Sequence, residues 1–227
     1  MTDKSYKGYD IILFDLDGTL TDSGEGIINS VKYALRTNGD DIPDESVLLK
    51  FIGPPLWESF ETFCGFSHEK ACGLVELYRE YYREKGLFEN AVYDGVEKML
   101  SELKAQGKRL AVATSKPEVF SVRILEHFGL AEYFENITGA TLDGTRIEKA
   151  DVIACALECC GADKDSRVLM VGDRKHDILG AHKNNIPCAA VLYGYGTREE
   201  FEEYGADYIV KEPSEIAALA AQEEGKR

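Results

Sequence analysis

The stretch Ile-Ile-Leu-Phe-Asp-Leu-Asp-Gly-Thr-Leu at residues 11–20 decides the fold. Residues 9–16 form a largely apolar run, which ends in carboxylates and Gly18. This pattern is typical of a parallel strand buried on both faces and of the loop that follows its carboxyl end. We therefore predict a central strand here, with polar residues where the strand stops.

Two more apolar runs end in polar residues, and each leads into a helical pattern. Residues 110–114 precede Lys116 and Pro117, where proline can occupy the first turn of a helix that runs to about residue 128. Residues 168–171 lead into Gly172 and a helix over residues 177–185, and shorter strands are predicted at residues 189–192 and 208–210. Strands alternating with helices predict an α/β fold, with a parallel sheet covered by helices on both faces.

A long segment without strand signals separates the first two predicted strands. It carries amphipathic helical patterns at residues 26–37, 56–63 and 69–85, punctuated by glycine and proline. A simple crossover between parallel strands needs about a dozen residues, so this segment is too long to be one. We predict an inserted helical domain at residues 23–93, and a core domain built from residues 1–22 and 94–227.

Composition and charge narrow the classes of partner. The chain has 227 residues, of which 44% are hydrophobic, and a net charge of -15. An acidic surface repels nucleic acid and anionic membranes, so neither is an expected partner. The apolar runs are too short to cross a bilayer, and residues 1–9 lack the apolar core of a secretion signal. The expected location is cytoplasmic.

The six cysteines do not have the paired spacing of a zinc site, and a reducing cytosol would leave them as free thiols. Cys155 and Cys159 are four residues apart, so they share a helix face. Small core residues are the favoured interpretation of this pair, ahead of metal ligands.

The predicted strand ends bring acidic and polar side chains to one edge of the sheet, where open parallel sheets bind ligands. Asp15 and Asp17 are two residues apart, so both can point into the same crevice. An ionised Asp15 can attack phosphorus, while Asp17 protonates the leaving oxygen and later deprotonates water. Gly18 allows a sharp turn whose N–H groups can face phosphate oxygens.

Residues from the other strand ends complete a predicted magnesium and phosphate site. Asp173 and Asp177 lie four apart and, with Asp15, offer the hard oxygen ligands that Mg²⁺ prefers. Thr114 supplies a hydroxyl for a phosphate oxygen, and Lys149 can neutralise charge on the nucleophile and the transferred phosphoryl group.

Each of these residues also has a structural interpretation when it is taken alone. The Asp-Leu-Asp-Gly-Thr segment has the composition of a turn with capping aspartates, and Asp177 is placed to cap the next helix. Thr114 is also a common kind of helix cap, and Lys149 is of a type that usually lies solvated on a helix. Their joint occurrence, in this order along the chain, favours the catalytic interpretation.

The chain resembles the haloacid dehalogenase superfamily of hydrolases over nearly its whole length. The resemblance is carried by Phe-Asp-Leu-Asp-Gly-Thr-Leu at 14–20, Thr114, Lys149 and Gly-Asp-x-x-x-Asp at 172–177. It implies a Rossmann-like core and a helical cap that closes over the active site and selects the substrate. The implied roles are nucleophile for Asp15, acid/base for Asp17, phosphate binding by Gly18, Thr114, Ser115 and Lys149, and Mg²⁺ binding by Asp15, Asp17, Asp173, Asp177 and the Leu16 carbonyl.

Finer resemblance points to the branch of phosphoglycolate phosphatases and 5′-nucleotidases. It is carried by Ala-Thr-Ser-Lys-Pro at 113–117, Phe-Ile-Gly-Pro-Pro-Leu at 51–56 and Val-Gly-Asp-Arg-Lys-His-Asp at 171–177. The expected substrate is a small phosphorylated metabolite, a nucleoside monophosphate or a phosphoglycolate-like compound. Two alternatives stay open, a phosphomutase of the same superfamily and a non-catalytic binding protein. The sequence leaves the oligomeric state undetermined.

Overall fold

A computed structural model describes residues 8–221 of the chain. The expectation drawn from the polar N-terminal residues 1–9 therefore falls almost entirely outside the described part. In residues 8–221, no helix combines the length and the apolar character that a membrane span requires.

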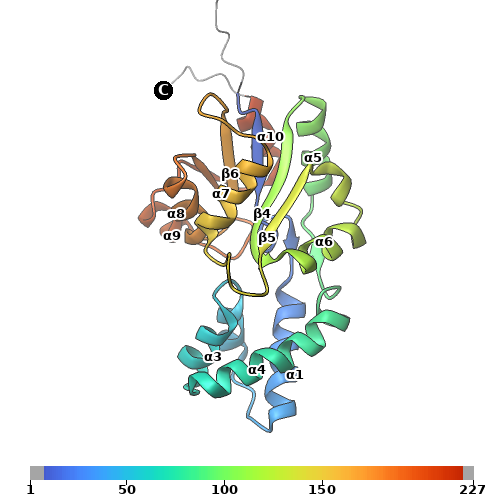
Figure 1. The fold of residues 1–227 in the computed structure, drawn as a ribbon, viewed down its shortest axis with the longest axis vertical. Helices are drawn as coiled ribbons and strands as arrows, with labels where there is room; N and C mark the ends of the chain where they lie inside the picture. The colour runs from blue at the N-terminus through green and yellow to red at the C-terminus, as the bar shows by residue number, and fades with distance from the viewer. Residues whose placement is uncertain (1–7, 222–227) are drawn as a thin grey trace, which may run out of the picture. The chain divides into compact units, whose positions relative to one another are not determined.

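The core is a sheet of six parallel strands in the order β5-β4-β1-β6-β7-β8, with helices on both sides (Figure 1). The strand β1 (Ile11–Phe14) lies centrally and is fully buried. The predicted α/β fold is therefore confirmed. The remaining strands are β4 (Arg109–Pro117), β5 (Asn136–Ala140), β6 (Val168–Gly172), β7 (Cys188–Val191) and β8 (Tyr208–Val210).

Within residues 8–221, six α-helices pack around this sheet. They are α5 (Val96–Ala105), α6 (Glu118–His127), α7 (Lys149–Cys159), α8 (Lys175–Lys183), α9 (Arg198–Glu203) and α10 (Pro213–Ala221). Side chains of α7 and α8, among them Ile153 and Ile178, join Leu13 of β1 and Met170 of β6 in one buried cluster. Because strand side chains alternate, Phe14 faces the opposite side of the sheet, where it is also buried. The sheet is thus covered on both faces.

Three short strands were not predicted. The edge strand β5 consists of Asn-Ile-Thr-Gly-Ala, which has too few apolar residues to stand out as a strand. Two others, β2 (Thr21–Asp22) and β3 (Ala91–Val92), pair with each other where the chain passes between its two units. Pairs of two residues carry almost no periodic signal, so only the folded chain reveals them.

Two predicted helix starts are wrong. Pro117 has ψ 129°, an extended conformation, so it ends β4 and precedes α6 instead of lying within its first turn. The helix α8 begins at Lys175, two residues before the predicted start at Asp177. Its first turn is stabilised by the Asp177 carboxylate, whose Oδ2 accepts hydrogen bonds from the N–H groups of Asp173 and Arg174.

The described chain divides into two compact units, one of residues 22–91 and one of the residues before and after them. The smaller unit is helical, and α1 packs on α4, which packs on α3. At its centre the Phe51 ring contacts the rings of Phe60 and Phe63. Its elements are α1 (Gly24–Asn38), α2 (Glu45–Leu48), η1 (Leu49–Phe51), α3 (Leu56–Cys64), α4 (His68–Tyr81) and the π-turn η2 (Tyr82–Gly86). The role of this unit as a cap stays a prediction.

Candidate active site

The carboxyl ends of three adjacent strands form the candidate site. In the sheet register Phe14 of β1 pairs with Val112 of β4 and Val171 of β6, so the residues that follow these strands lie at one edge. The backbone N–H of Asp15 donates to the Val171 carbonyl at 2.9 Å, which fixes the start of the loop after β1. The predicted meeting of these distant segments is confirmed.

Lys149 links two of the aspartates. Its Nζ lies 2.9 Å from Asp15 Oδ1 and 2.7 Å from Asp177 Oδ1, and only 5% of its side chain is exposed. Burial alone would lower the pKa of Lys149, but the two carboxylates raise it above its ordinary value. Lys149 is therefore a buried cation of the site, and its interpretation as a solvated helix residue is wrong.

Asp173 joins the two lysine-bound aspartates in one carboxylate cluster. Oxygens of Asp15, Asp173 and Asp177 all lie within 4.8 Å of one another. Burial, with the charges of Asp177 and Asp15, raises the pKa of Asp173 well above its ordinary value. Burial also raises the pKa of Asp177, to about 6, although Lys149 opposes this shift. Asp173 Oδ1 is buried and has no hydrogen-bond partner among the described residues. A hard divalent cation fits this donor set, since it would satisfy that oxygen and offset the repulsion.

Asp17 is separate from this carboxylate cluster. Its Oδ2 lies 2.8 Å from Nζ of Lys116, whose side chain is only 6% exposed. The sequence analysis did not identify Lys116 as a site residue. The only signal was its position two residues after Thr114 at a predicted strand end. This signal was weak, because lysine side chains are usually exposed.

The predicted phosphate-binding residues differ in their surroundings. Thr114 is buried, and its Oγ1 accepts a hydrogen bond from the backbone N–H of Lys116, while Ser115 is exposed. Gly18 has φ 78°, and a Cβ there would lie 2.1 Å from Asp173 Oδ2. Both the backbone conformation and the closeness of Asp173 therefore require glycine at this position.

The role of the Leu16 carbonyl in binding magnesium stays a prediction. This carbonyl accepts hydrogen bonds from the N–H groups of Leu20 at 2.9 Å and Thr21 at 3.0 Å. The Thr19 N–H also donates to it, at 3.3 Å, so this carbonyl closes the turn after β1.

The loop after β7 also contributes to the site, and the sequence analysis missed it. The Tyr195 N–H donates to Asp173 Oδ2 at 2.8 Å, and the Tyr193 hydroxyl donates to the Thr19 carbonyl at 3.1 Å. A Cβ on Gly194 would lie 2.2 Å from the Gly18 carbonyl oxygen, so the two loops touch through their backbones. The repeated glycines and tyrosines of residues 193–196 were the available signal. The loop holds Asp173 so that Oδ1 stays unpaired.

This fold and site agree with a known family. The model of the haloacid dehalogenase-like hydrolases matches residues 12–191. The chain belongs to this family and is one of its phosphatases.

Individual proteins of known name or structure are also similar to this chain. A "5′-nucleotidase" of Pseudomonas aeruginosa is 46% identical over 93% of this chain and 94% of its own length. A "Tyrosine-protein kinase PtkA" of Mycobacterium tuberculosis is 40% identical over 93% of this chain and 69% of its own. The crystal structure of a predicted phosphatase from Clostridium acetobutylicum has a TM-score of 0.86 and 50% identity, and covers 92% of this chain and 97% of its own. The fold prediction and the assignment to a phosphatase family are confirmed.

Proposed function

We propose that this phosphatase hydrolyses a nucleoside 5′-monophosphate through a phosphoryl group carried on Asp15. The observation that supports this most is the Lys149 ammonium, 2.9 Å from Asp15 Oδ1. It offsets the repulsion between an anionic nucleophile and an anionic phosphate. The carboxylate is therefore ready to act as a nucleophile.

In the first step, an oxygen of Asp15 attacks phosphorus while Asp17 donates a proton to the leaving ribose oxygen. In the second step, Asp17 takes a proton from water, which attacks the phosphoryl group and frees Asp15. Each role requires Asp17 to stay in one orientation. The ion pair with Lys116 at 2.8 Å supplies that orientation.

Asp15, Asp173 and Asp177 would hold Mg²⁺. When bound, the ion draws negative charge from the phosphate oxygens and supports in-line attack. The predicted assignment of Asp17 as a further ligand stays a prediction, since its carboxylate lies outside the three-aspartate cluster. Thr114 and the backbone around Gly18 would hold the phosphate oxygens from the protein side, and Ser115 would join them.

The substrate class rests on the similarity to the 5′-nucleotidase of Pseudomonas aeruginosa, at 46% identity. The helical unit of residues 22–91 would act as the cap and select the leaving group, as predicted for residues 23–93. Phosphoglycolate is the competing small substrate from the sequence analysis.

A second candidate is transfer of the phosphoryl group from Asp15 to an acceptor other than water. It includes the predicted phosphomutase alternative. The 40% identity to a protein named as a tyrosine kinase is the observation in its favour. Both candidates share Asp15 and differ in what removes the phosphoryl group.

The test is a screen of phosphate monoesters with Mg²⁺, comparing nucleoside monophosphates, phosphoglycolate and sugar phosphates. We expect nucleoside monophosphates to give the highest kcat/KM, with release of inorganic phosphate. Asp15→Asn should remove activity while the circular dichroism spectrum stays unchanged. Activity that survives in a folded Asp15→Asn variant would exclude the mechanism, and phosphate found on an organic acceptor would favour the second candidate.

A further inference from the structure

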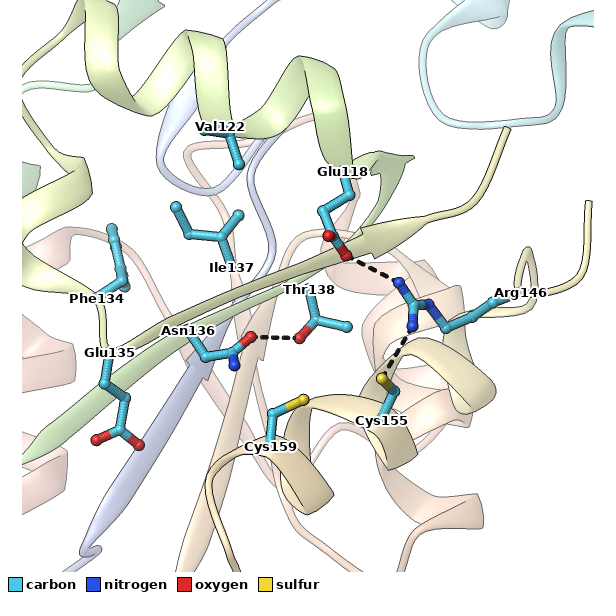
Figure 2. A pocket seen from close by; sticks show the side chains of 10 residues that line it. All are labelled: Glu118, Val122, Phe134, Glu135, Asn136, Ile137, Thr138, Arg146, Cys155 and Cys159. Carbon is cyan, nitrogen blue, oxygen red and sulfur yellow. Dashed lines mark hydrogen bonds and ion pairs between the residues drawn. The ribbon is translucent and has the colours of Figure 1, made fainter. Parts of the chain in front are cut away.

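A cavity of about 510 Å³ lies beside the edge strand β5, between α6 and α7. Its volume is within the range of roughly 300–1,000 Å³ that small-molecule sites occupy. Its lining includes Glu118, Glu135, Arg146, Cys155 and Cys159 (Figure 2). None of the residues assigned above to catalysis or metal binding lines it.

Two thiols reach this cavity from α7. The prediction that they are core residues is wrong, because Cys159 is exposed and Cys155 is partly exposed. Cys160 and Cys188, by contrast, are buried. The helix has thus placed a pair of accessible thiols in a pocket large enough for a small molecule.

Cys155 differs from its neighbour in its contact with a guanidinium group. Arg146 Nη1 donates to Cys155 Sγ at 2.9 Å, while Nη2 lies 2.8 Å from Glu118 Oε2 (Figure 2). Burial raises the pKa of Cys155, and the positive charge of Arg146 opposes that rise. The carboxylate of Glu118 and the neighbouring thiol of Cys159 add to the rise, so the pKa of Cys155 stays above its ordinary value and Arg146 offsets only part of the cost of forming the reactive thiolate.

The same arginine fastens the loop that leads to Lys149. Its Nε donates to the Gly139 carbonyl at 2.9 Å, and its backbone N–H donates to Thr141 Oγ1 at 3.0 Å. The loop ends at the first residue of α7, which is Lys149. Cys155, Arg146 and Lys149 are thus joined through one loop and one helix.

We propose that Cys155 is a site of reversible S-thiolation by small disulfides. The Cys155 thiolate attacks one sulfur of a disulfide RSSR, the S–S bond of the reagent breaks, and a protein–S–S–R bond forms. The released RS⁻ takes up the proton lost by Cys155, so Cys155 is oxidised while half of the reagent is reduced to RSH. The R group then occupies the cavity.

A disulfide between Cys155 and Cys159 is the competing product, and helix geometry disfavours it. Residues four apart on a helix have Cβ atoms about 5–6 Å apart. A disulfide needs a Cβ–Cβ distance of about 3.5–4.5 Å. An outside thiol is not held to this spacing, so the mixed disulfide forms without unwinding α7.

The charge around the cavity favours one kind of disulfide reagent over another. Glu118 is paired with Arg146, and Glu135 is paired with Arg109 at 2.7 Å, so these four charges balance. The whole chain is strongly acidic, with a net charge of -15. A neutral reagent should therefore react more completely than an anionic one such as oxidised glutathione.

The experiment equilibrates the full-length protein with a redox buffer of 2-hydroxyethyl disulfide and 2-mercaptoethanol, followed by peptide mass spectrometry. Equilibrium occupancy removes differences in reaction rate among the thiols. We expect occupancy of Cys155 about fivefold higher than that of the exposed Cys72 and Cys159, which corresponds to roughly 1 kcal/mol of contact within the cavity. Oxidised glutathione at the same redox potential should give lower occupancy of Cys155.

Three variants serve as controls. Cys159→Ser should keep the adduct on Cys155, and Cys155→Ser should lose it while the melting temperature stays the same. Arg146→Lys retains a charge but loses the guanidinium contact, and should slow the approach of Cys155 to its equilibrium occupancy. Occupancy of Cys155 at or below that of Cys72, or a Cys155–Cys159 disulfide as the main product, would overturn the proposal. So would adducts on the buried Cys160 or Cys188, because labelling would then follow unfolding.

The adduct should displace Arg146, which fastens the loop leading to Lys149, and should thereby affect catalysis. Only this consequence rests on the proposed function. Modified wild-type enzyme should lose about tenfold in kcat, as small displacements of a catalytic group produce. Dithiothreitol should restore it, and Cys155→Ser should be insensitive. The peptide map decides the modification site even if no phosphatase substrate is found, so failure of one proposal is distinguishable from failure of the other.

Discussion

Lys116 Nζ lies 2.8 Å from Asp17 Oδ2, which pairs the proposed acid/base of the site with a buried cation. The other oxygen of Asp17 is buried without a hydrogen-bond partner among the described residues. The lysine therefore orients the carboxylate and leaves one oxygen for proton transfer. This relationship makes Lys116 part of the proposed catalytic arrangement.

Replacing Lys116 should slow turnover. We expect Lys116→Gln to lower kcat by about tenfold, because a mispositioned acid/base loses part of its usual 10²–10⁴-fold contribution. Steady-state kinetics measure this loss. Lys164→Gln is the matched control, since Lys164 is exposed, and its kcat should be unchanged. Equal kcat values for the two variants would contradict the role of Lys116.

The acid role of Asp17 should depend on the leaving group. Asp17→Asn cannot donate the proton, so kcat/KM for a nucleoside monophosphate should fall by about 10²–10⁴-fold. With p-nitrophenyl phosphate the loss should be much smaller, because its leaving oxygen needs no protonation. A similar loss for both substrates would rule out general acid catalysis by Asp17.

Magnesium should stabilise the protein. Because the pKa of Asp173 is raised in the folded state, the unfolded chain releases this proton at lower pH. Without a cation, stability is therefore lost as pH rises above the ordinary aspartate pKa. Bound Mg²⁺ reverses this effect, so we expect its gain in Tm to be larger at pH 7.5 than at pH 5.5. The gain should reach several degrees, since about 1 kcal/mol shifts Tm by roughly 2–4 °C at this chain length.

Asp173→Asn tests the same three-aspartate cluster by removing a negative charge instead of adding a cation. It removes one of the three repelling carboxylates, so the metal-free Tm should rise. The response to Mg²⁺ should largely disappear, because a ligand has been lost. Differential scanning fluorimetry measures both effects. A variant that keeps the full Mg²⁺ shift would show that the ion binds elsewhere.

Gly194 should tolerate no side chain. A Cβ at this position would lie 2.2 Å from the Gly18 carbonyl oxygen and 2.5 Å from Asp173 Cβ. We expect Gly194→Ala to lower the free energy of unfolding by about 1–3 kcal/mol. The control is Gly73→Ala in α4, where a Cβ meets nothing within 4 Å and alanine should add up to about 1 kcal/mol of helix stability. Equal stabilities would show that the two loops separate easily.

The sequence by itself determined the parallel sheet and the main motif residues. Buried strands such as β1 and β6 are continuous apolar runs, and the polar residues after them are read directly from the chain. The carboxyl ends of parallel strands share one edge of the sheet, which predicts that Asp15, Thr114 and Asp173 meet there. These signals are local, so one sequence is enough to read them.

Tertiary structure decided the contacts that no local pattern encodes. Lys116 became the partner of Asp17, the loop at residues 193–196 came to hold Asp173, and the Leu16 carbonyl was used to close a turn. Cys155 was placed in a cavity against Arg146 instead of in the core. Each contact joins side chains or backbone groups whose meeting depends on how the loops pack. The nucleophile Asp15 can thus be identified from the sequence, while the contacts around the site form only when the chain is folded.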